Sequence, residues 1–179
     1  IFGVEVKITD DDNKELPWDG VAFGALKVRG PWICSSYFKL EGSSAHEEDG
    51  WFETGDVASI DANGNVSITD RTKDVIKSGG EWISSIEVEN CATGHPMVAE
   101  AAVIGRIHPK WGERPLLIVV KNGEGDVSPD ELKGFLDGKI AKWWIPDDVQ
   151  YIEEMPHTAT GKVQKMKLRE MFANYQFPG

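Results

Sequence analysis

Two different patterns of apolar and polar positions divide the sequence near residue 70. Apolar and polar residues alternate over residues 4–9 and again over residues 24–30, a period of two that is typical of half-buried strands. A further extended segment begins at residues 51–52, and residues 66–69 form another after an Asn- and Gly-rich turn. The first part of the chain is therefore predicted to be a small, mostly antiparallel β unit.

After residue 83 the pattern changes to alternating helices and strands. Serines followed by early acidic residues predict a helix that begins at residues 84–85 and ends near Gly94. Ser128 with Pro129 caps a second helix, and a basic terminal helix is predicted over residues 163–172. Three apolar runs of strand length lie at residues 98–104, 116–120 and 149–152. The second part is therefore predicted to be an α+β unit with helices beside a small sheet.

Residues 70–83 connect the two parts and have an unusual composition. Within these fourteen positions lie a glycine pair, a tryptophan and three basic residues: Arg71, Lys73 and Lys77. Basic side chains beside glycines suit an anion site, because the glycine backbone can come close to a ligand. The alternative is a surface β-hairpin whose glycines only turn the chain, and the spacing alone favours neither interpretation.

Composition and charge limit the classes of protein that fit. Hydrophobic residues make up 40% of the sequence and charged residues 27%, as in globular domains. The formal charge of −11, from 30 acidic and 19 basic residues, argues against general nucleic-acid binding. Cys34 and Cys91 have no CxxC or metal-ligand spacing, and the four histidines are scattered, so we predict a reducing, cytoplasmic location and no metal site.

No part of the sequence predicts a membrane span or a secretion signal. No run approaches the ~20 apolar residues that a transmembrane helix needs. The chain opens with Ile1-Phe2-Gly3, without a methionine or a signal pattern, and we therefore expect a fragment of a longer protein.

Asp56 is a candidate ligand-binding residue in the sequence Trp51-Phe52-Glu53-Thr54-Gly55-Asp56. We interpret Thr54-Gly55 as a turn that directs the aspartate out of the end of a strand. A carboxylate there can accept two hydrogen bonds from a vicinal diol such as that of ribose. On this motif alone, the simpler alternative of an aspartate satisfied within its own turn is favoured.

Lys162 is a second candidate, because a loop flanked by proline and glycine presents it just before the terminal helix. Its long stem and point charge suit a lysine that reaches a phosphate or carboxylate on which charge is building. A solvated lysine at the start of a helix is the alternative. A P-loop is excluded, since Val163 follows Lys162 and no glycine stands five positions before Gly161.

The three clusters, in this order and spacing, resemble the adenylate-forming superfamily of acyl-CoA synthetases, luciferases and peptide-synthetase adenylation domains. The resemblance covers almost the whole chain, and Lys77-Ser78-Gly79-Gly80-Glu81-Trp82-Ile83 is most similar to medium- and long-chain fatty acyl-CoA synthetases. It implies that residues 1–70 are the last β subdomain of a large N-terminal domain. It further implies a hinge at residues 71–73 and a compact, mobile α+β C-terminal domain at residues 74–179.

The same resemblance implies a two-step ligase reaction. ATP activates a carboxylic acid, expected to be a fatty acid, to an acyl-adenylate, and the thiol of coenzyme A then displaces AMP. Lys162 is the implied catalytic residue and Lys73 the turning point of the hinge. The implied ATP- and AMP-binding residues are Asp56, Arg71, Lys73, Lys77 and Trp82. The implied CoA-binding residues are Ser78, Gly79 and Gly80. For Trp82, a core aromatic at the domain seam is the alternative.

Several parts of the superfamily pattern are missing from this sequence. It contains no phosphate loop, no aromatic-Gly-x-Thr-Glu segment for adenine and magnesium, and no acyl pocket. We therefore expect the Mg2+ ligands and the acid pocket in an upstream N-terminal domain, and no activity from this chain alone. The open alternatives are an adenylating enzyme that does not use CoA and a non-catalytic nucleotide-binding module. A homo-oligomer also stays open.

Overall fold

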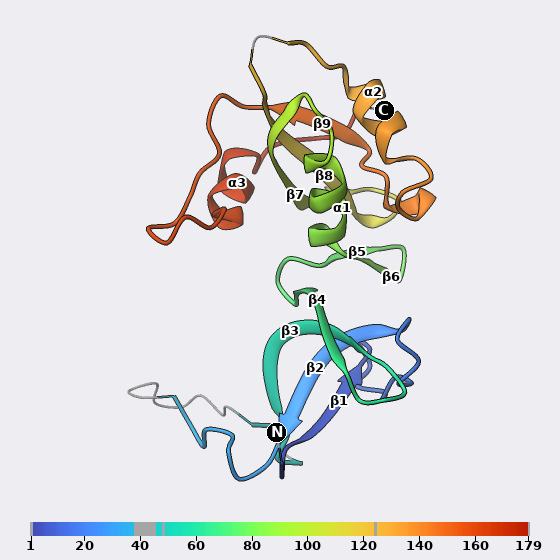
Figure 1. Ribbon diagram of the computed structural model, residues 1–179, viewed down its shortest axis with the longest axis vertical. Coiled ribbons are helices and arrows are strands. Elements are labelled where there is room, and N and C mark those ends of the chain that lie inside the picture. Colours follow the sequence, from blue (N-terminus) through green and yellow to red (C-terminus); the bar gives the residue numbers. More distant parts are fainter. Residues whose placement is uncertain (1, 38–45, 48, 124, 179) are drawn as a thin grey trace. The chain divides into compact units, whose positions relative to one another are not determined.

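The computed structural model describes residues 2–37, 46–47, 49–123 and 125–178 (Figure 1). The chain divides into two compact units, Ile1–Lys73 and Asp74–Gly179. No helix among the described residues is long and apolar enough to cross a membrane.

The first unit is a four-stranded antiparallel sheet with the order β1-β2-β3-β4. Its strands are β1 (Glu5–Thr9), β2 (Phe23–Arg29), β3 (Phe52–Ile60) and β4 (Val66–Arg71). Alternate residues of the strands face one side, where Ile8, Leu26, Ala58 and Ile60 form the core. The prediction of a small antiparallel β unit is confirmed.

The second unit contains a mixed sheet and three short α-helices. Strands β5 (Ile76–Ser78), β6 (Glu81–Ile83), β7 (Val98–His108) and β8 (Gly112–Lys121) follow the order β6-β5-β8-β7. Strand β9 (Asp148–Tyr151) pairs with β8 in parallel. The helices are α1 (Ser85–Thr93), α2 (Pro129–Leu136) and α3 (Lys165–Met171), with a 3-10 turn η1 (Lys142–Trp144). The predicted α+β class is confirmed.

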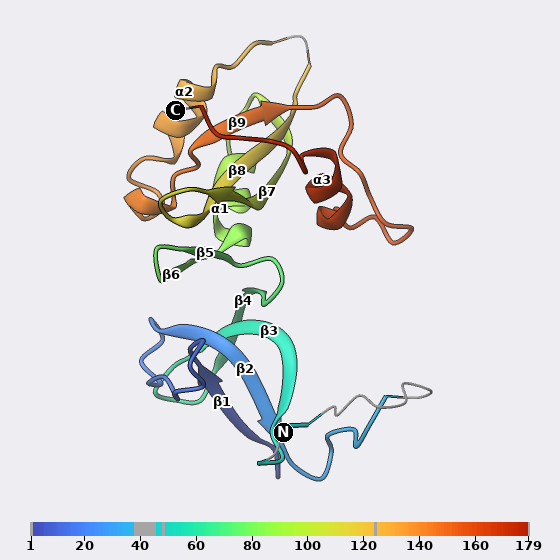
Figure 2. The same cartoon turned by 180° about the vertical axis from the view of Figure 1, so that it is seen from behind.

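The two faces of this sheet are covered by different parts of the chain. Helix α1 packs against β7 and α2 on one face, where Val88 and Ala92 are buried. On the other face α3 and the chain that follows it pack against Ala102, Ile104, Leu116 and related residues. Figure 2 shows this tail, in dark red, running from α3 back across the sheet toward α2.

The predicted helix starts agree with the structure where the signal is local. Ser84 and Ser128 are both N-caps, and the Ser128 side chain forms a capping box with Glu131. The predicted start of the terminal helix at residue 163 is wrong by two residues, because Val163 pairs with His157 in an isolated β-bridge. The helix therefore begins only at Lys165.

Candidate functional site

Asp56 lies inside β3, so the predicted turn at a strand end is wrong. Ala25 of β2 pairs with Val57 and Lys27 pairs with Glu53, which leaves residues 54–56 opposite the single residue Leu26. Gly55 has a φ of +75°, which a glycine adopts without strain. The segment is therefore a β-bulge, and bulges of this kind redirect a side chain within a continuous sheet.

Backbone and side-chain hydrogen bonds hold this bulge in place. The Thr54 hydroxyl donates to the Leu26 carbonyl at 3.0 Å and accepts the Asp56 N–H at 3.1 Å. The Thr72 N–H donates to the Gly55 carbonyl at 3.0 Å. Both neighbouring strands thus fix the position of the Asp56 backbone.

Asp56 and Arg71, two predicted nucleotide-binding residues, are brought together by the pairing of β3 with β4. They are directly opposite in the register, and Arg71 Nε lies 3.1 Å from Asp56 Oδ1. The Asp56 side chain is 27% exposed and the Arg71 side chain 60% exposed. A half-buried carboxylate beside an accessible guanidinium can accept bonds from a diol and neutralise a nearby anion.

Residues 76–83 form a hairpin in which Gly79 and Gly80 are the two-residue turn. Ile76 pairs with Ile83, Lys77 with Trp82 and Ser78 with Glu81. Gly79 has a φ of +62° and Gly80 a φ of +90°, as a hairpin turn with two left-handed positions requires. The hairpin alternative therefore describes the local fold, but a β-hairpin can also carry ligand contacts.

The two glycines have different surroundings. A Cβ atom added to Gly79 would lie 3.0 Å from Trp111 Cε3, whereas nothing lies within 4 Å of one added to Gly80. Gly79 is also anchored, because its N–H donates to the Trp111 carbonyl at 2.8 Å. Gly79 thus allows a close contact within the unit, and Gly80 presents open backbone.

Lys77 and Trp82 face each other across the hairpin. Lys77 Nζ lies 5.0 Å from the centroid of a Trp82 ring, within cation–π range. The Lys77 N–H donates to Glu113 Oε2 at 3.1 Å. Trp82 is only half buried.

A cavity of about 330 Å³ borders the glycine turn. It is lined by Ser78, Gly79, Glu81, Trp111, Arg114, Trp143 and Asp147. Ser78 and Gly79 were predicted CoA contacts, whereas the other lining residues were not predicted as site residues. Trp111 and Trp143 are each 43% exposed, so two aromatic rings stand at an accessible surface.

Arg114 is the polar centre of this cavity and was missed by the sequence analysis. Its Nε lies 2.7 Å from Asp147 Oδ1, and so does Nη2. Nη1 donates to the Trp143 carbonyl at 2.8 Å and to Ser78 Oγ at 3.2 Å, and Nη2 donates to the Ile145 carbonyl at 3.1 Å. The only signal in the sequence is an arginine between a glutamate and a proline, which does not indicate these partners.

Lys162 lies on a tight turn of its own. His157 and Val163 pair at its base, and the Thr158 N–H donates to the Lys162 carbonyl at 2.8 Å. Gly161 has a φ of +80°. Near this base, His157 Nε2 lies 2.8 Å from Glu100 Oε2 of β7. Lys162 itself is exposed.

Lys73 is exposed and is the last residue of the first compact unit. The two roles predicted for Lys73, as the hinge and as a nucleotide contact, stay predictions. Because each unit is a separate body, the Asp56–Arg71 pair and the Lys162 turn are two distinct groups of candidate residues.

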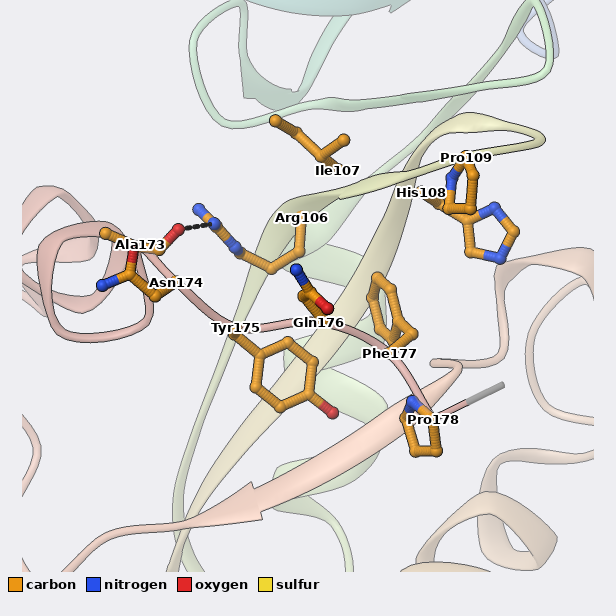
Figure 3. A pocket seen from close by; sticks show the side chains of 10 residues that line it. All are labelled: Arg106, Ile107, His108, Pro109, Ala173, Asn174, Tyr175, Gln176, Phe177 and Pro178. Atoms are coloured by element: carbon orange, nitrogen blue, oxygen red, sulfur yellow. Dashed lines mark hydrogen bonds between the residues drawn. The ribbon is translucent and has the colours of Figure 1, made fainter.

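A larger cavity of about 600 Å³ lies between the end of β7 and the C-terminal tail (Figure 3). Arg106 Nη2 donates to the Ala173 carbonyl at 2.5 Å, and the buried Arg106 Nε has no hydrogen-bond partner among the described residues. Burial and a hydrogen bond to Asp148 raise the pKa of the Tyr175 hydroxyl. No predicted site residue lines this cavity.

The comparisons with known proteins address the family. Residues 87–162 match the AMP-binding enzyme C-terminal domain, and Lys162 is the last residue of the match. This segment of the chain is an AMP-binding enzyme C-terminal domain. The AMP-binding C-terminal domain begins within α1 and includes both long strands of the second unit.

The relatives that this chain matches are CoA ligases. It is 58% identical to a 3-methylmercaptopropionyl-CoA ligase of Ruegeria lacuscaerulensis, over 96% of the chain and 32% of that relative. It is 47% identical to a medium-chain-fatty-acid–CoA ligase of Ectopseudomonas oleovorans, over 97% of the chain and 32% of the relative. The chain thus spans about a third of the length of these relatives.

A solved structure supports the same assignment. The crystal structure of ATP-bound MatB from Rhodopseudomonas palustris matches with a TM-score of 0.81 and 34% identity, covering 95% of this chain and 34% of that one. The predicted membership of the adenylate-forming enzymes is confirmed. The roles of the individual site residues stay predictions.

Proposed function

We propose that this chain acts as the C-terminal portion of an AMP-forming acid–CoA ligase. The observation that carries this proposal is the match to CoA ligases along 96% and 97% of the chain. The complete enzyme uses ATP with Mg2+ to activate a carboxylic acid to an acyl-adenylate, and the thiol of CoA then displaces AMP. The Mg2+ ligands and the acid pocket belong to the upstream part of the enzyme.

In this proposal Asp56 and Arg71 bind the nucleotide. Asp56 accepts hydrogen bonds from the ribose hydroxyls, and Arg71 orients that carboxylate and contributes positive charge toward the same nucleotide. Their pairing at 3.1 Å and their partial exposure support the assignment. Lys77 and Trp82 contribute a cation and an aromatic face near the nucleotide.

Lys162 is the proposed catalytic residue of the adenylation step. Its ammonium compensates the negative charge that builds on the carboxylate and the α-phosphate as the acid attacks. Support comes from its exposure on a turn, from which a long side chain can reach a substrate.

Lys73 is the proposed pivot about which the second unit moves between the two steps. After that movement the Ser78-Gly79-Gly80 turn guides the CoA thiol. The absence of any atom within 4 Å of a Cβ built on Gly80 supports this role, because a ligand can pass close to the backbone there.

The acid is proposed to be a fatty acid or a short, sulfur-containing acid. A fatty acid is proposed because one relative is a medium-chain-fatty-acid–CoA ligase. A short, sulfur-containing acid is proposed because another is a 3-methylmercaptopropionyl-CoA ligase. Cys34 and Cys91 are both free thiols, which fits a reducing compartment such as the cytoplasm. A homo-oligomer stays an open prediction.

The test uses this chain joined to the region that matches the rest of its relatives. Lys162→Ala is expected to slow acid-dependent pyrophosphate release by at least about 100-fold, since removing one charge-stabilising group costs about that much. Lys167→Ala, a change of an exposed lysine on α3, is the control and should leave the rate unchanged. Wild-type pyrophosphate release by Lys162→Ala would contradict the proposed role.

A second measurement separates the rival functions. AMP release from a preformed adenylate should require CoA if the enzyme is a CoA ligase. Adenylate formation without CoA-dependent AMP release would indicate an enzyme with another acceptor, and nucleotide binding without adenylation would indicate a binding module.

The hinge has its own test. Lys73→Pro fixes φ and removes a backbone donor, so it should slow thioester formation more than adenylation. An equal loss of both steps in a folded protein would contradict a pivot at Lys73.

A further inference from the structure

The β5–β6 hairpin has little backbone pairing with the rest of its sheet. Only Ser78 of β5 pairs with β8, opposite Gly112. The Gly79 N–H bond to Trp111 and the Lys77 N–H bond to Glu113 add to this pairing. A turn attached over so short a ladder needs side-chain contacts to keep its position.

Arg114 supplies such a contact and links the turn to a second segment. One side of its guanidinium bonds Ser78, which immediately precedes the glycine turn. The other contacts are the Trp143 and Ile145 carbonyls and the Asp147 carboxylate. Three parts of the second unit thus meet at the Arg114 guanidinium: the hairpin, β8 and residues 143–147.

Most of the Arg114 donors are used within the protein. A guanidinium has five N–H groups in a fixed fork, and the structure shows four hydrogen bonds from it, at 2.7 to 3.2 Å. Nη2 also lies 2.7 Å from Asp147 Oδ1, and the Arg114 side chain is 12% exposed. Because these contacts lie within the protein, Arg114 is suited to hold its neighbours rather than to bind a phosphate.

We infer that Arg114 is a positioning residue for thioester formation, acting by fixing the Gly79-Gly80 turn against residues 143–147. This inference rests on the proposed function, since it deepens the role given to the glycine turn. Trp111 and Trp143, which stand on the two sides joined by Arg114, then keep the 330 Å³ cavity open beside the turn.

Lysine cannot replace this arginine in the inferred role. A lysine carries one ammonium with three donors and cannot span Ser78, the two carbonyls and Asp147 in a fixed plane. The turn would then lose its link to residues 143–147 while the strand β8 stays in place. Adenylation, which this inference does not assign to the turn, should be spared.

The experiment measures both half-reactions of Arg114→Lys in the full-length protein that includes this chain. Acid-dependent ATP–pyrophosphate exchange reports adenylation, and single-turnover acyl transfer from a preformed adenylate to CoA reports thioester formation. We expect exchange within about twofold of wild type and acyl transfer slowed about tenfold to 100-fold, the loss that follows a misplacement of about 1 Å. Arg29→Lys, on strand β2 of the first unit, changes an arginine whose side chain is 42% exposed; it is the matched control and should leave both rates unchanged.

A double-variant cycle tests the route through Ser78. If Arg114 acts on the turn through the Ser78 hydroxyl, the combined Arg114→Lys and Ser78→Ala variant should be slowed less than the product of the two single effects. Independent, multiplicative effects would overturn this route. If Arg114→Lys does not fold, Ser78→Ala decides, because it removes one contact and keeps the Arg114–Asp147 pair; unchanged acyl transfer would then overturn the inference.

The outcomes distinguish the two levels of the proposal. A wild-type protein without either half-reaction would contradict the proposed function. A wild-type protein with both half-reactions, together with an Arg114→Lys variant that loses both equally or neither, would overturn only the positioning role.

Discussion

Two tight turns of the second unit are built on left-handed glycines but are held in different ways. The Gly79-Gly80 turn is tied to its surroundings by Trp111, Glu113 and Arg114. The hydrogen bonds of the Lys162 turn are mainly within its own backbone, with one partly exposed contact between His157 and Glu100 near its base. A turn that offers backbone to a ligand has to be placed accurately, whereas a lysine with a long flexible stem needs a less exact position of its backbone.

Removal of Asp147 is expected to have the largest effect on stability. Asp147→Ala leaves the largely buried Arg114 charge without its carboxylate, which should lower the free energy of unfolding by about 2 to 3 kcal/mol. Urea unfolding followed by circular dichroism measures the change. Asp126→Ala, which removes the partner of the more exposed Lys121, is the control and should have a much smaller effect. Equal effects of the two variants would show that the Arg114 contacts do not matter for stability.

Alanine at the glycines of the two turns should produce a graded loss. Gly79→Ala combines a left-handed backbone with a 3.0 Å approach to Trp111, so it should cost about 2 kcal/mol or more. Gly80→Ala and Gly161→Ala meet no atom within 4 Å and should each cost about 1 kcal/mol from the backbone alone. Thermal unfolding of the three variants tests the order, and a Gly80 or Gly161 effect above that of Gly79 would contradict it.

Loss of the contact between His157 and Glu100 near the Lys162 turn should have the smallest effect. Glu100 is 40% exposed and His157 is 35% exposed, so Glu100→Gln should change the free energy of unfolding by less than about 1 kcal/mol. Urea titration at neutral pH gives this value. A loss as large as that of Asp147→Ala would mean that the Lys162 turn is held as firmly as the glycine turn, and the contrast between them would disappear.

The sequence predicted those features whose causes lie close together along the chain. Ser84 and Ser128 cap helices through residues three positions later, and the alternating strands of the first unit follow their own local pattern. The glycine hairpin was one of two open interpretations because Gly-Gly in a turn is also a local signal. The family followed from three short motifs in order.

The missed features depend on partners that are distant in sequence. The bulge at Thr54 requires the register with β2, and nothing near Gly55 distinguishes a bulge from a turn. Arg114 obtains its contacts from residues 29 to 36 positions away. The start of α3 depends on whether Val163 pairs with His157, which periodicity does not reveal.

The start of β8 has a practical consequence for anyone who exchanges parts between this chain and its relatives. Gly112, Glu113 and Arg114 are consecutive, and each contacts the β5–β6 hairpin by a different means: strand pairing, a backbone-to-carboxylate bond and a guanidinium bond. A graft that transfers the hairpin without residues 111–114 would separate matched parts. Chimeras should therefore keep these two segments from the same parent, even though more than thirty residues separate Ser78 from Trp111 in the chain.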